Sequence, residues 1–470
     1  MKKPNVKPVG ISIDNVQDTR DITFPKDILE QVIGQDGAVR KVRLAIDQRR
    51  HLLLVGPPGI GKSMLAQALA QHLPKPSQEI YVVDNPANQM RPLVEVVKNV
   101  FRQDFIKPDE APAYIAEQLG FKCPTCGALS GVKDVVCPRC GEKKYHRITL
   151  QDEIQTTRFN SGGREEGLVY KRDGERILVV GHQPEISDVV GLKSSESRQD
   201  LRKMVLVKIN RKTFVHATGA SETELLGDVR HDPYGSHPEI GTPAFMRVAP
   251  GAIHEAHEGV LFIDELPHLG NLQNFILTAM QEKKFSILGL NPQSAGAAVK
   301  VEDVPCDFVF VGACNIKDVQ SILSPLRSRI LGNGYEILLN TTMPDTLENQ
   351  SLLARFVAQE VAKDGKIPPA TRDAIEDLVQ EARRRARTID DARNALTLRL
   401  RDLGGVLRMA GDFAVSEKSK YIQSRHVQEA IEESKPIEIQ LEERYGSVWK
   451  GIEKDQVVSP EYGKLGKSYI

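Results

Sequence analysis

Short apolar runs alternate with segments of helical spacing along much of the chain. Each run is four or five residues long, and the first is stopped by Gly-Pro-Pro-Gly. A short run bounded by turn residues is typical of a strand that is buried on both faces, as in a parallel sheet. Helical segments lie between several runs, which predicts crossover connections in a wound α/β sheet. The runs that we assign to this sheet are residues 51–55, 80–83, 260–263, 308–311 and 335–339.

The pattern changes twice along the chain. Between residues 85 and 212 the α/β alternation is lost, which predicts an inserted subdomain. From residue 341 onward the strands cease and apolar residues recur at three- and four-residue spacing, which predicts a lid of four helices. We therefore expect a polar arm at 1–24, an α/β domain at 25–340 interrupted by the insert 85–212, an α-helical lid at 341–436 and a polar tail at 437–470.

Composition excludes several classes of protein. Lys+Arg and Asp+Glu both number 63, so the chain has no global positive field that would attract nucleic acid. Apolar residues make up 40%, but no uninterrupted stretch approaches the ~20 residues of a membrane-spanning helix. The N-terminal region also lacks the apolar stretch of a signal peptide. We expect a cytoplasmic protein with no membrane partner.

A phosphate-binding motif follows the first apolar run. It fits the pattern GxxxxGK[ST] and lies between a strand and a helix, which is the context that the motif requires. Its glycines allow backbone N–H groups to approach phosphate oxygens at a helix N-terminus. A glycine-rich turn without a nucleotide is the alternative, but the order of strand, loop and helix favours ATP. We expect Lys62 to neutralise the β and γ phosphates and Ser63 to bind Mg²⁺, within a loop of Gly56, Pro57, Pro58, Gly59, Ile60, Gly61, Lys62 and Ser63.

Polar residues end the later strands. Asp264 and Glu265 close the run 260–263, where ligands of wound sheets collect. Asp264 is expected to hold Mg²⁺ and Glu265 to act as the general base on the attacking water. Asn315 ends the next run and could reach the water or the γ-phosphate, although an Asn at a strand end is also a common turn residue. Arg329 or Arg327 is placed to meet the γ-phosphate of a neighbouring subunit.

Four cysteines form two CPxCG knuckles within a ribbon at residues 121–146. Four thiolates on two tight turns suit tetrahedral zinc, with a Zn–S distance of ~2.3 Å. Iron is the alternative metal. Because the protein fills every position, the site is expected to be structural. The adjacent basic residues 143–147 could contact nucleic acid or form a solvated strand, and we favour protein recognition or ring assembly. The ligands are Cys123, Cys126, Cys137 and Cys140.

Six longer segments share a pattern with one known family, namely residues 32–35, 226–233, 277–285, 325–329, 342–346 and 396–405. They resemble the ATPase half of archaeal-type (B-type) Lon proteases. The resemblance spans about residues 24–84 and 213–441 and implies an AAA+ fold in a homo-hexameric ring with ATP sites between subunits. It implies a sensor-1 role for Asn315, an arginine finger at Arg329 and a sensor-2 arginine at Arg401, with Arg399 as the weaker candidate.

The resemblance also implies a motor that unfolds protein substrates and threads them through a pore. The loops that would line it lie at about 234–245 and 285–298. The family's Ser–Lys proteolytic domain is not within these residues, so we expect the peptidase on another chain or on a missing continuation. The family's membrane spans are likewise not found in the insert. The alternatives are a remodelling chaperone without a peptidase and, with less support, a nucleic-acid motor.

Overall fold

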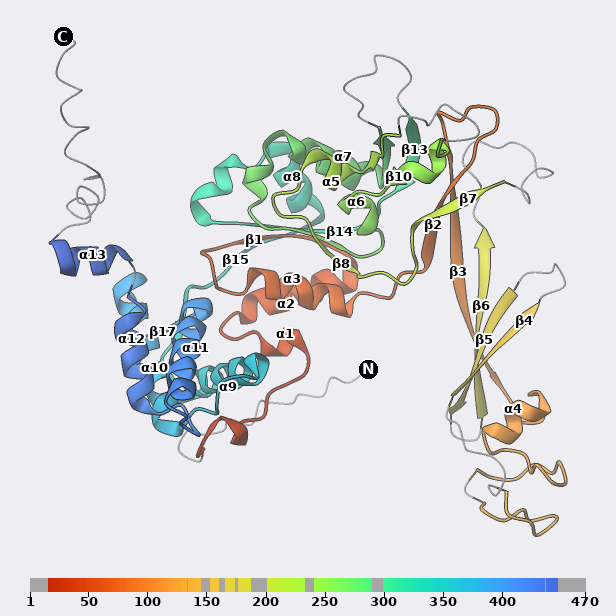
Figure 1. Ribbon diagram of the computed structural model, residues 1–470, viewed down its shortest axis with the longest axis horizontal. Helices are drawn as coiled ribbons and strands as arrows, with labels where there is room; N and C mark the ends of the chain where they lie inside the picture. Colours follow the sequence, from red (N-terminus) through yellow and green to blue (C-terminus); the bar gives the residue numbers. More distant parts are fainter. Residues whose placement is uncertain are drawn as a thin grey trace. The chain divides into compact units, whose positions relative to one another are not determined.

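The computed structural model divides the chain into two compact units. Figure 1 shows the course of the chain through its helices and strands. The first unit comprises Met1–His72, Asp264–Pro267 and Val311–Ile470, and the second comprises Leu73–Ile263 and His268–Phe310. The structure describes residues 16–132, 134–144, 153–159, 165–173, 176–186, 201–232, 241–289, 299–435 and 437–446.

Five strands form a sheet with the order β15-β1-β14-β11-β8. Strand β1 pairs in parallel with β14 and with β15, and β11 pairs in parallel with β8. All residues of β11 and β14 are buried. The α/β class with a parallel sheet is therefore confirmed. The strands are β1 (His51–Val55), β8 (Phe214–His216), β11 (Val260–Ile263), β14 (Val309–Cys314) and β15 (Gly334–Leu338).

One strand predicted for the parallel sheet is wrong. Residues 80–83 belong to β2 (Gln78–Val83), which pairs antiparallel with β3 (Leu93–Ile106) and β7 (Lys203–Val207). The strand that takes part in the parallel sheet is β8, which has only three residues and does not stand out as an apolar run. In β2, Ile80 and Val82 are buried while the residues before and between them are half-buried. That alternation is typical of an antiparallel strand.

The second unit carries a long antiparallel sheet with the order β4-β5-β6-β3-β2-β7. Figure 1 shows helix α4 (Ala113–Gln118) lying near β4, β5 and β6. Ile115 and Leu119 pack there against Ile154, Tyr170 and Ile177. This cluster gives the inserted sheet a small apolar core of its own. The additional strands are β4 (Glu153–Phe159), β5 (Glu165–Asp173) and β6 (Arg176–Ile186).

The remaining elements of the second unit are short. Strand β12 pairs antiparallel with β13, and β9 pairs with β10. Of the expected pore loops, residues 234–240 and 290–298 lie outside the described residues. No helix in the described part of the chain has the length and apolarity needed to cross a membrane. The elements are α5 (Glu222–Leu226), β9 (Asp228–Val229), β10 (Val248–Ala249), α6 (Ala252–Glu255), α7 (Gln273–Glu282), β12 (Lys284–Leu288) and β13 (Lys300–Pro305).

Helices dominate the first unit, and the four helices expected after residue 341 are present. The expectation that strands cease there is wrong, because β16 (Thr342–Pro344) pairs antiparallel with β17 (Ala395–Thr397). Leu378, Leu407 and Val427 come from three different lid helices and share one buried cluster. Residues of this kind at helical spacing give each helix an apolar face. The lid helices are α9 (Leu347–Asp364), α10 (Arg372–Ile389), α11 (Leu400–Ser416) and α12 (Ser424–Glu433), and the others are α1 (Ile28–Gln31), α2 (Asp36–Gln48), α3 (Lys62–His72), α8 (Ser324–Asn333) and α13 (Ile437–Tyr445).

The segment at residues 16–22 packs against the lid. Val16 and Ile22 belong to the buried lid cluster. The Thr19 backbone N–H donates to the Ala370 carbonyl at 3.0 Å. This part of the expected polar arm is therefore anchored by apolar burial and backbone hydrogen bonds, and residues 1–15 lie outside the described residues.

A buried histidine in the second unit predicts acid sensitivity. His254 on α6 is 0% exposed, its Nε2 donates to the Phe285 carbonyl at 3.1 Å, and its Nδ1 accepts from Gly251 N–H at 3.3 Å. Burial lowers its pKa from 6.5 to about 4. The fold therefore keeps this ring neutral. The contribution of the neutral ring to the free energy of unfolding is fully present above pH 6.5 and is lost as the pH falls towards 4.

We expect this loss to reach at most about 3 kcal/mol of the free energy of unfolding. The measurement is the urea midpoint of the protein and of the variant His254→Gln at several pH values from 7.5 to 4.5. The variant should be less stable at pH 7.5, and the difference should shrink as the pH falls. A constant difference over this range would contradict the prediction.

Candidate functional site

The phosphate-binding loop connects β1 to α3 in the first unit. Gly59 and Gly61 have φ of +80° and +98°, a region that favours glycine. The loop is fixed to the sheet by a hydrogen bond from Gly56 N–H to the Cys314 carbonyl at 3.1 Å. Because Lys62 begins α3, the N–H groups of the loop and of the first helical turn can converge on an anion.

The Lys62 side chain is folded into this loop. It is only 7% exposed, and its Nζ donates to the carbonyls of Gly56 at 2.7 Å and Pro57 at 3.1 Å. Burial lowers the pKa of Lys62, and the Asp264 and Glu265 carboxylates oppose that shift. These carboxylates follow β11 and belong to the same compact unit as the loop. The structure thus brings together the lysine and the two acids that the sequence singled out.

Glu265 has an unusual backbone conformation. Its φ is +54°, a left-handed value that costs of order 1–3 kcal/mol for residues other than glycine. The Asp264 Oδ1 accepts a hydrogen bond from the Glu265 N–H at 3.1 Å. Such strained residues cluster at functional sites, where the surrounding structure holds them. Glu265 is exposed at this turn and accessible to a water molecule.

Asn315 lies beside the phosphate-binding loop. It follows β14, whose last residue, Cys314, is paired with Val55 of β1. Its Oδ1 accepts from Lys62 Nζ at 3.5 Å, and its Nδ2 donates to Asp318 Oδ2 at 3.3 Å. Asp318 was not among the residues expected at the site, although the spacing Asn-x-x-Asp after an apolar strand could have indicated a side-chain contact across the following turn.

The structure distinguishes between the candidate arginines on α8. Arg327 is bound to Glu336 through Nε at 2.6 Å and Nη2 at 2.8 Å. Arg329 is exposed, and we find no ion pair for it among the described residues. Because a bidentate pair already occupies Arg327, Arg329 is the arginine that α8 can offer to another molecule. Within the described part of the chain, no hydrogen bond or ion pair joins the Arg329 side chain to the phosphate-binding loop.

A similar distinction holds on the lid. Arg399 Nη2 donates to Asp390 at 2.8 Å, so its guanidinium is engaged. Arg401 is exposed, and its backbone N–H donates to the Gly59 carbonyl at 3.3 Å. A Cβ added at Gly59 would lie 2.8 Å from the Arg401 Cβ. Helix α11 therefore begins directly against the phosphate-binding loop, which places Arg401 at the site.

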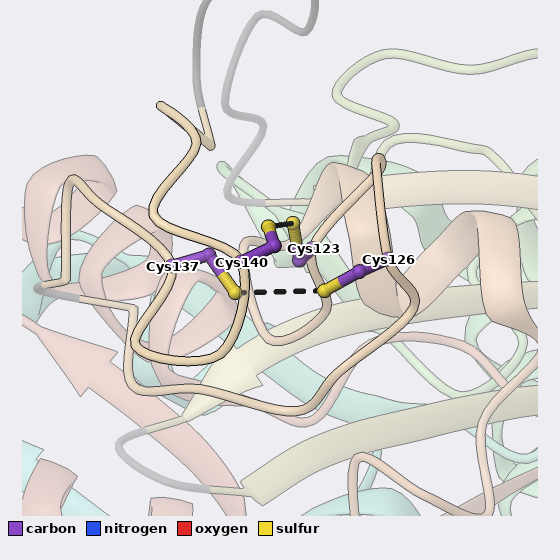
Figure 2. Close-up of side chains that lie close together, drawn as sticks. All are labelled: Cys123, Cys126, Cys137 and Cys140. Carbon is purple, nitrogen blue, oxygen red and sulfur yellow. Dashed lines mark hydrogen bonds between the residues drawn. The ribbon is translucent and has the colours of Figure 1, made fainter.

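Four cysteine sulfurs lie close together in the second unit, all within 4.8 Å of one another. Figure 2 shows them on two facing turns, with dashed contacts that run from one turn to the other. The distances are 3.8 Å for Cys123–Cys140 and 3.6 Å for Cys126–Cys137. A tetrahedral ion with Zn–S bonds of ~2.3 Å requires sulfurs about 3.8 Å apart. The cluster therefore fits a metal of this kind.

The two turns that carry the cysteines have the same hydrogen bonds. Gly127 N–H donates to the Cys123 carbonyl and Gly141 N–H donates to the Cys137 carbonyl, each at 2.9 Å. Both glycines have positive φ, at 68° and 73°. Backbone N–H groups of Cys140 and Arg139 lower the pKa of Cys137 to about 6. The turn therefore favours the thiolate of Cys137, which is the metal-binding form, whereas contacts with the neighbouring cysteine sulfurs raise the pKa of Cys140.

Lys144 is not part of a solvated basic strand. It is 1% exposed, and its Nζ donates to the carbonyls of Gly120 and Gly131, both at 2.8 Å. The ammonium thus ties together the segments on both sides of the first knuckle. Lys143 is exposed, and residues 145–147 of the expected run lie outside the described residues.

Comparison with known proteins gives two kinds of match. A family model described as magnesium chelatase, subunit ChlI, matches residues 28–131. A Lon protease homolog of Methanothermobacter thermautotrophicus is 51% identical over 97% of this chain and 96% of its own length. A Lon protease homolog of Thermoplasma acidophilum is 48% identical over 94% of each chain.

The archaeal Lon protease of Thermococcus kodakarensis is 39% identical over 97% of this chain but only 67% of its own length. Identity at these levels over nearly the whole chain, together with the phosphate-binding loop on a parallel sheet, shows that the chain belongs to the archaeal Lon family and is an AAA+ ATPase.

Proposed function

We propose that the chain is the motor of an ATP-dependent proteolytic system, in which ATP hydrolysis drives the unfolding and threading of protein substrates. The peptidase is supplied by another chain or by a continuation of this one. The observation that supports the proposal most directly is the contact of α11 with the phosphate-binding loop at Gly59. A nucleotide held there contacts both the sheet and the lid, so its hydrolysis can move one against the other.

Different residues of the first unit bind the phosphates, bind Mg²⁺ and activate the attacking water. The N–H groups of the loop and the Lys62 ammonium bind the phosphates, which requires Nζ to exchange the carbonyls of Gly56 and Pro57 for phosphate oxygens. Ser63 and Asp264 would hold Mg²⁺, a cation that neutralises charge on the phosphate oxygens. Glu265 accepts the proton of the attacking water.

The arginines complete the site from two directions. Arg401 on α11 belongs to the same chain as the phosphate-binding loop. It contacts the bound nucleotide and so couples the state of the nucleotide to the position of the lid. Arg329 is exposed on α8 and is offered to the site of a neighbouring copy, where a guanidinium stabilises transition-state charge. This arrangement requires a ring of identical subunits, which we take to be a hexamer in the cytoplasm.

The cysteine cluster is assigned to a structural zinc ion. Its support is the set of sulfur distances, which match a tetrahedral ion, and the pair of equivalent turns. Four protein thiolates leave no open position for chemistry. The ion would hold the ribbon folded at a part of the chain where the apolar core is small.

The proposed function is tested by the substrate that stimulates hydrolysis. Phosphate release by the purified protein is measured alone, with an unfolded protein such as casein, and with single- or double-stranded DNA. We expect casein to raise the rate and DNA to leave it unchanged. Stimulation by DNA alone would contradict a protein-directed motor and favour a nucleic-acid motor.

A further inference from the structure

The side-chain amide of Asn315 lies between two opposite charges. The Lys62 ammonium donates to the Asn315 Oδ1 at 3.5 Å, and the Asn315 Nδ2 donates to the Asp318 carboxylate at 3.3 Å. If the amide were turned over, its N–H groups would face the ammonium and its oxygen would face the carboxylate. Both contacts would then be repulsive. These two charges therefore fix which end of the amide faces the phosphate-binding loop.

Asp318 is held in place by the turn that follows Asn315. Residues Ile316–Ser321 form a short 3₁₀ helix, and Asp318 N–H donates to the Asn315 carbonyl at 3.1 Å. Asp318 is half-buried, whereas Lys317 beside it is exposed. The same turn thus joins the two residues through the backbone and through the side chains, which limits the positions that the Asp318 carboxylate can take.

The orientation of the amide decides what Asn315 can bind. Its oxygen, which faces Lys62, accepts hydrogen bonds, and so do the oxygens of a phosphate. Water can donate to the amide oxygen, but a γ-phosphate oxygen cannot. When ATP draws the Lys62 ammonium to its phosphates, Asp318 is the charge that continues to hold the amide.

We infer that Asp318 is a positioning residue, which keeps the Oδ1 of Asn315 directed at the attacking water rather than at the γ-phosphate. The inference rests on the proposed ATP hydrolysis and on the sensor-1 role that the family resemblance implies for Asn315. It assigns Asn315 and Glu265 to the same water molecule, one as the acceptor that orients it and the other as its base. The effect of Asp318 should therefore appear in the rate of hydrolysis and not in ATP binding.

The experiment is a double-mutant cycle of Asn315→Ala and Asp318→Ala, with kcat and KM for ATP measured in the full chain. Asp318→Ala should lower kcat by about tenfold or more, since misplacing a catalytic group by about 1 Å can cost 10²-fold, and should leave KM nearly unchanged. The double variant should be no slower than Asn315→Ala, because Asp318 acts through Asn315. Asp318→Asn removes the charge and offers an amide that can pair with either end of the Asn315 amide, so it should also be slow.

The variant Lys317→Ala changes an exposed residue of the same turn and should behave like the unchanged protein. The inference is overturned if the two single effects multiply in the double variant, or if Asp318→Ala raises KM without lowering kcat. It is also overturned if Asp318→Asn is as fast as the unchanged protein. Full activity of Asn315→Ala would instead overturn the proposed role of Asn315 itself, so the two failures can be told apart.

Discussion

Replacement of Glu265 by glutamine is expected to stop ATP hydrolysis while ATP stays bound. Glutamine has nearly the same size and can occupy the same turn, but its amide does not take a proton from water. Loss of a general base typically lowers the rate by about 10²–10⁴-fold. Turnover is measured as steady-state phosphate release, and binding is measured by titration with a fluorescent ATP analogue.

The matched control is Glu282→Gln, which makes the same change at an exposed position at the end of α7. It should leave both hydrolysis and binding as they are. Unchanged turnover of the Glu265 variant would remove Glu265 as the base. Loss of binding together with turnover would point to a distorted loop, which thermal unfolding of the variant would reveal.

Removal of one cysteine ligand is expected to release the metal and unfold the ribbon. Cys137→Ser replaces a thiolate whose turn favours the charged form, so the site loses its tetrahedral set. Structural zinc contributes about 10–16 kcal/mol in isolated zinc-finger peptides, and the ribbon has a small apolar core with which to compensate. Metal content per chain and the rate of proteolysis within residues 107–144 are the measurements.

We expect one metal ion per reduced chain of the unchanged protein and none in the Cys137 variant, which should be cleaved faster in the ribbon. Cys306→Ala is the control, because this buried thiol lies outside the cluster and should leave the metal in place. A colourless protein that contains zinc would favour zinc over iron. A full metal content in Cys137→Ser, or none in the unchanged protein, would contradict the assignment.

Local motifs allowed much of the candidate site to be predicted. Residues that are close together in the chain define three features, and the types of those residues indicate the chemistry of each. These features are the loop 56–63, the acids at the end of β11 and the cysteine knuckles. The same holds for the lid, whose helices keep a regular apolar spacing. The strand at 80–83 was misassigned because a four-residue apolar run does not reveal which strands will pair with it.

The sequence by itself determined the nucleotide-binding loop, the acidic pair, the cysteine set and the α/β class followed by a helical lid, because these depend on spacing along the chain. The family resemblance already favoured Arg329 and Arg401, and only the tertiary structure revealed that ion pairs with Glu336 and Asp390 engage Arg327 and Arg399. It also placed Asp318 against Asn315 and buried Lys144 in the ribbon. Those outcomes depend on which side chains meet in space, and residue spacing alone does not contain that information.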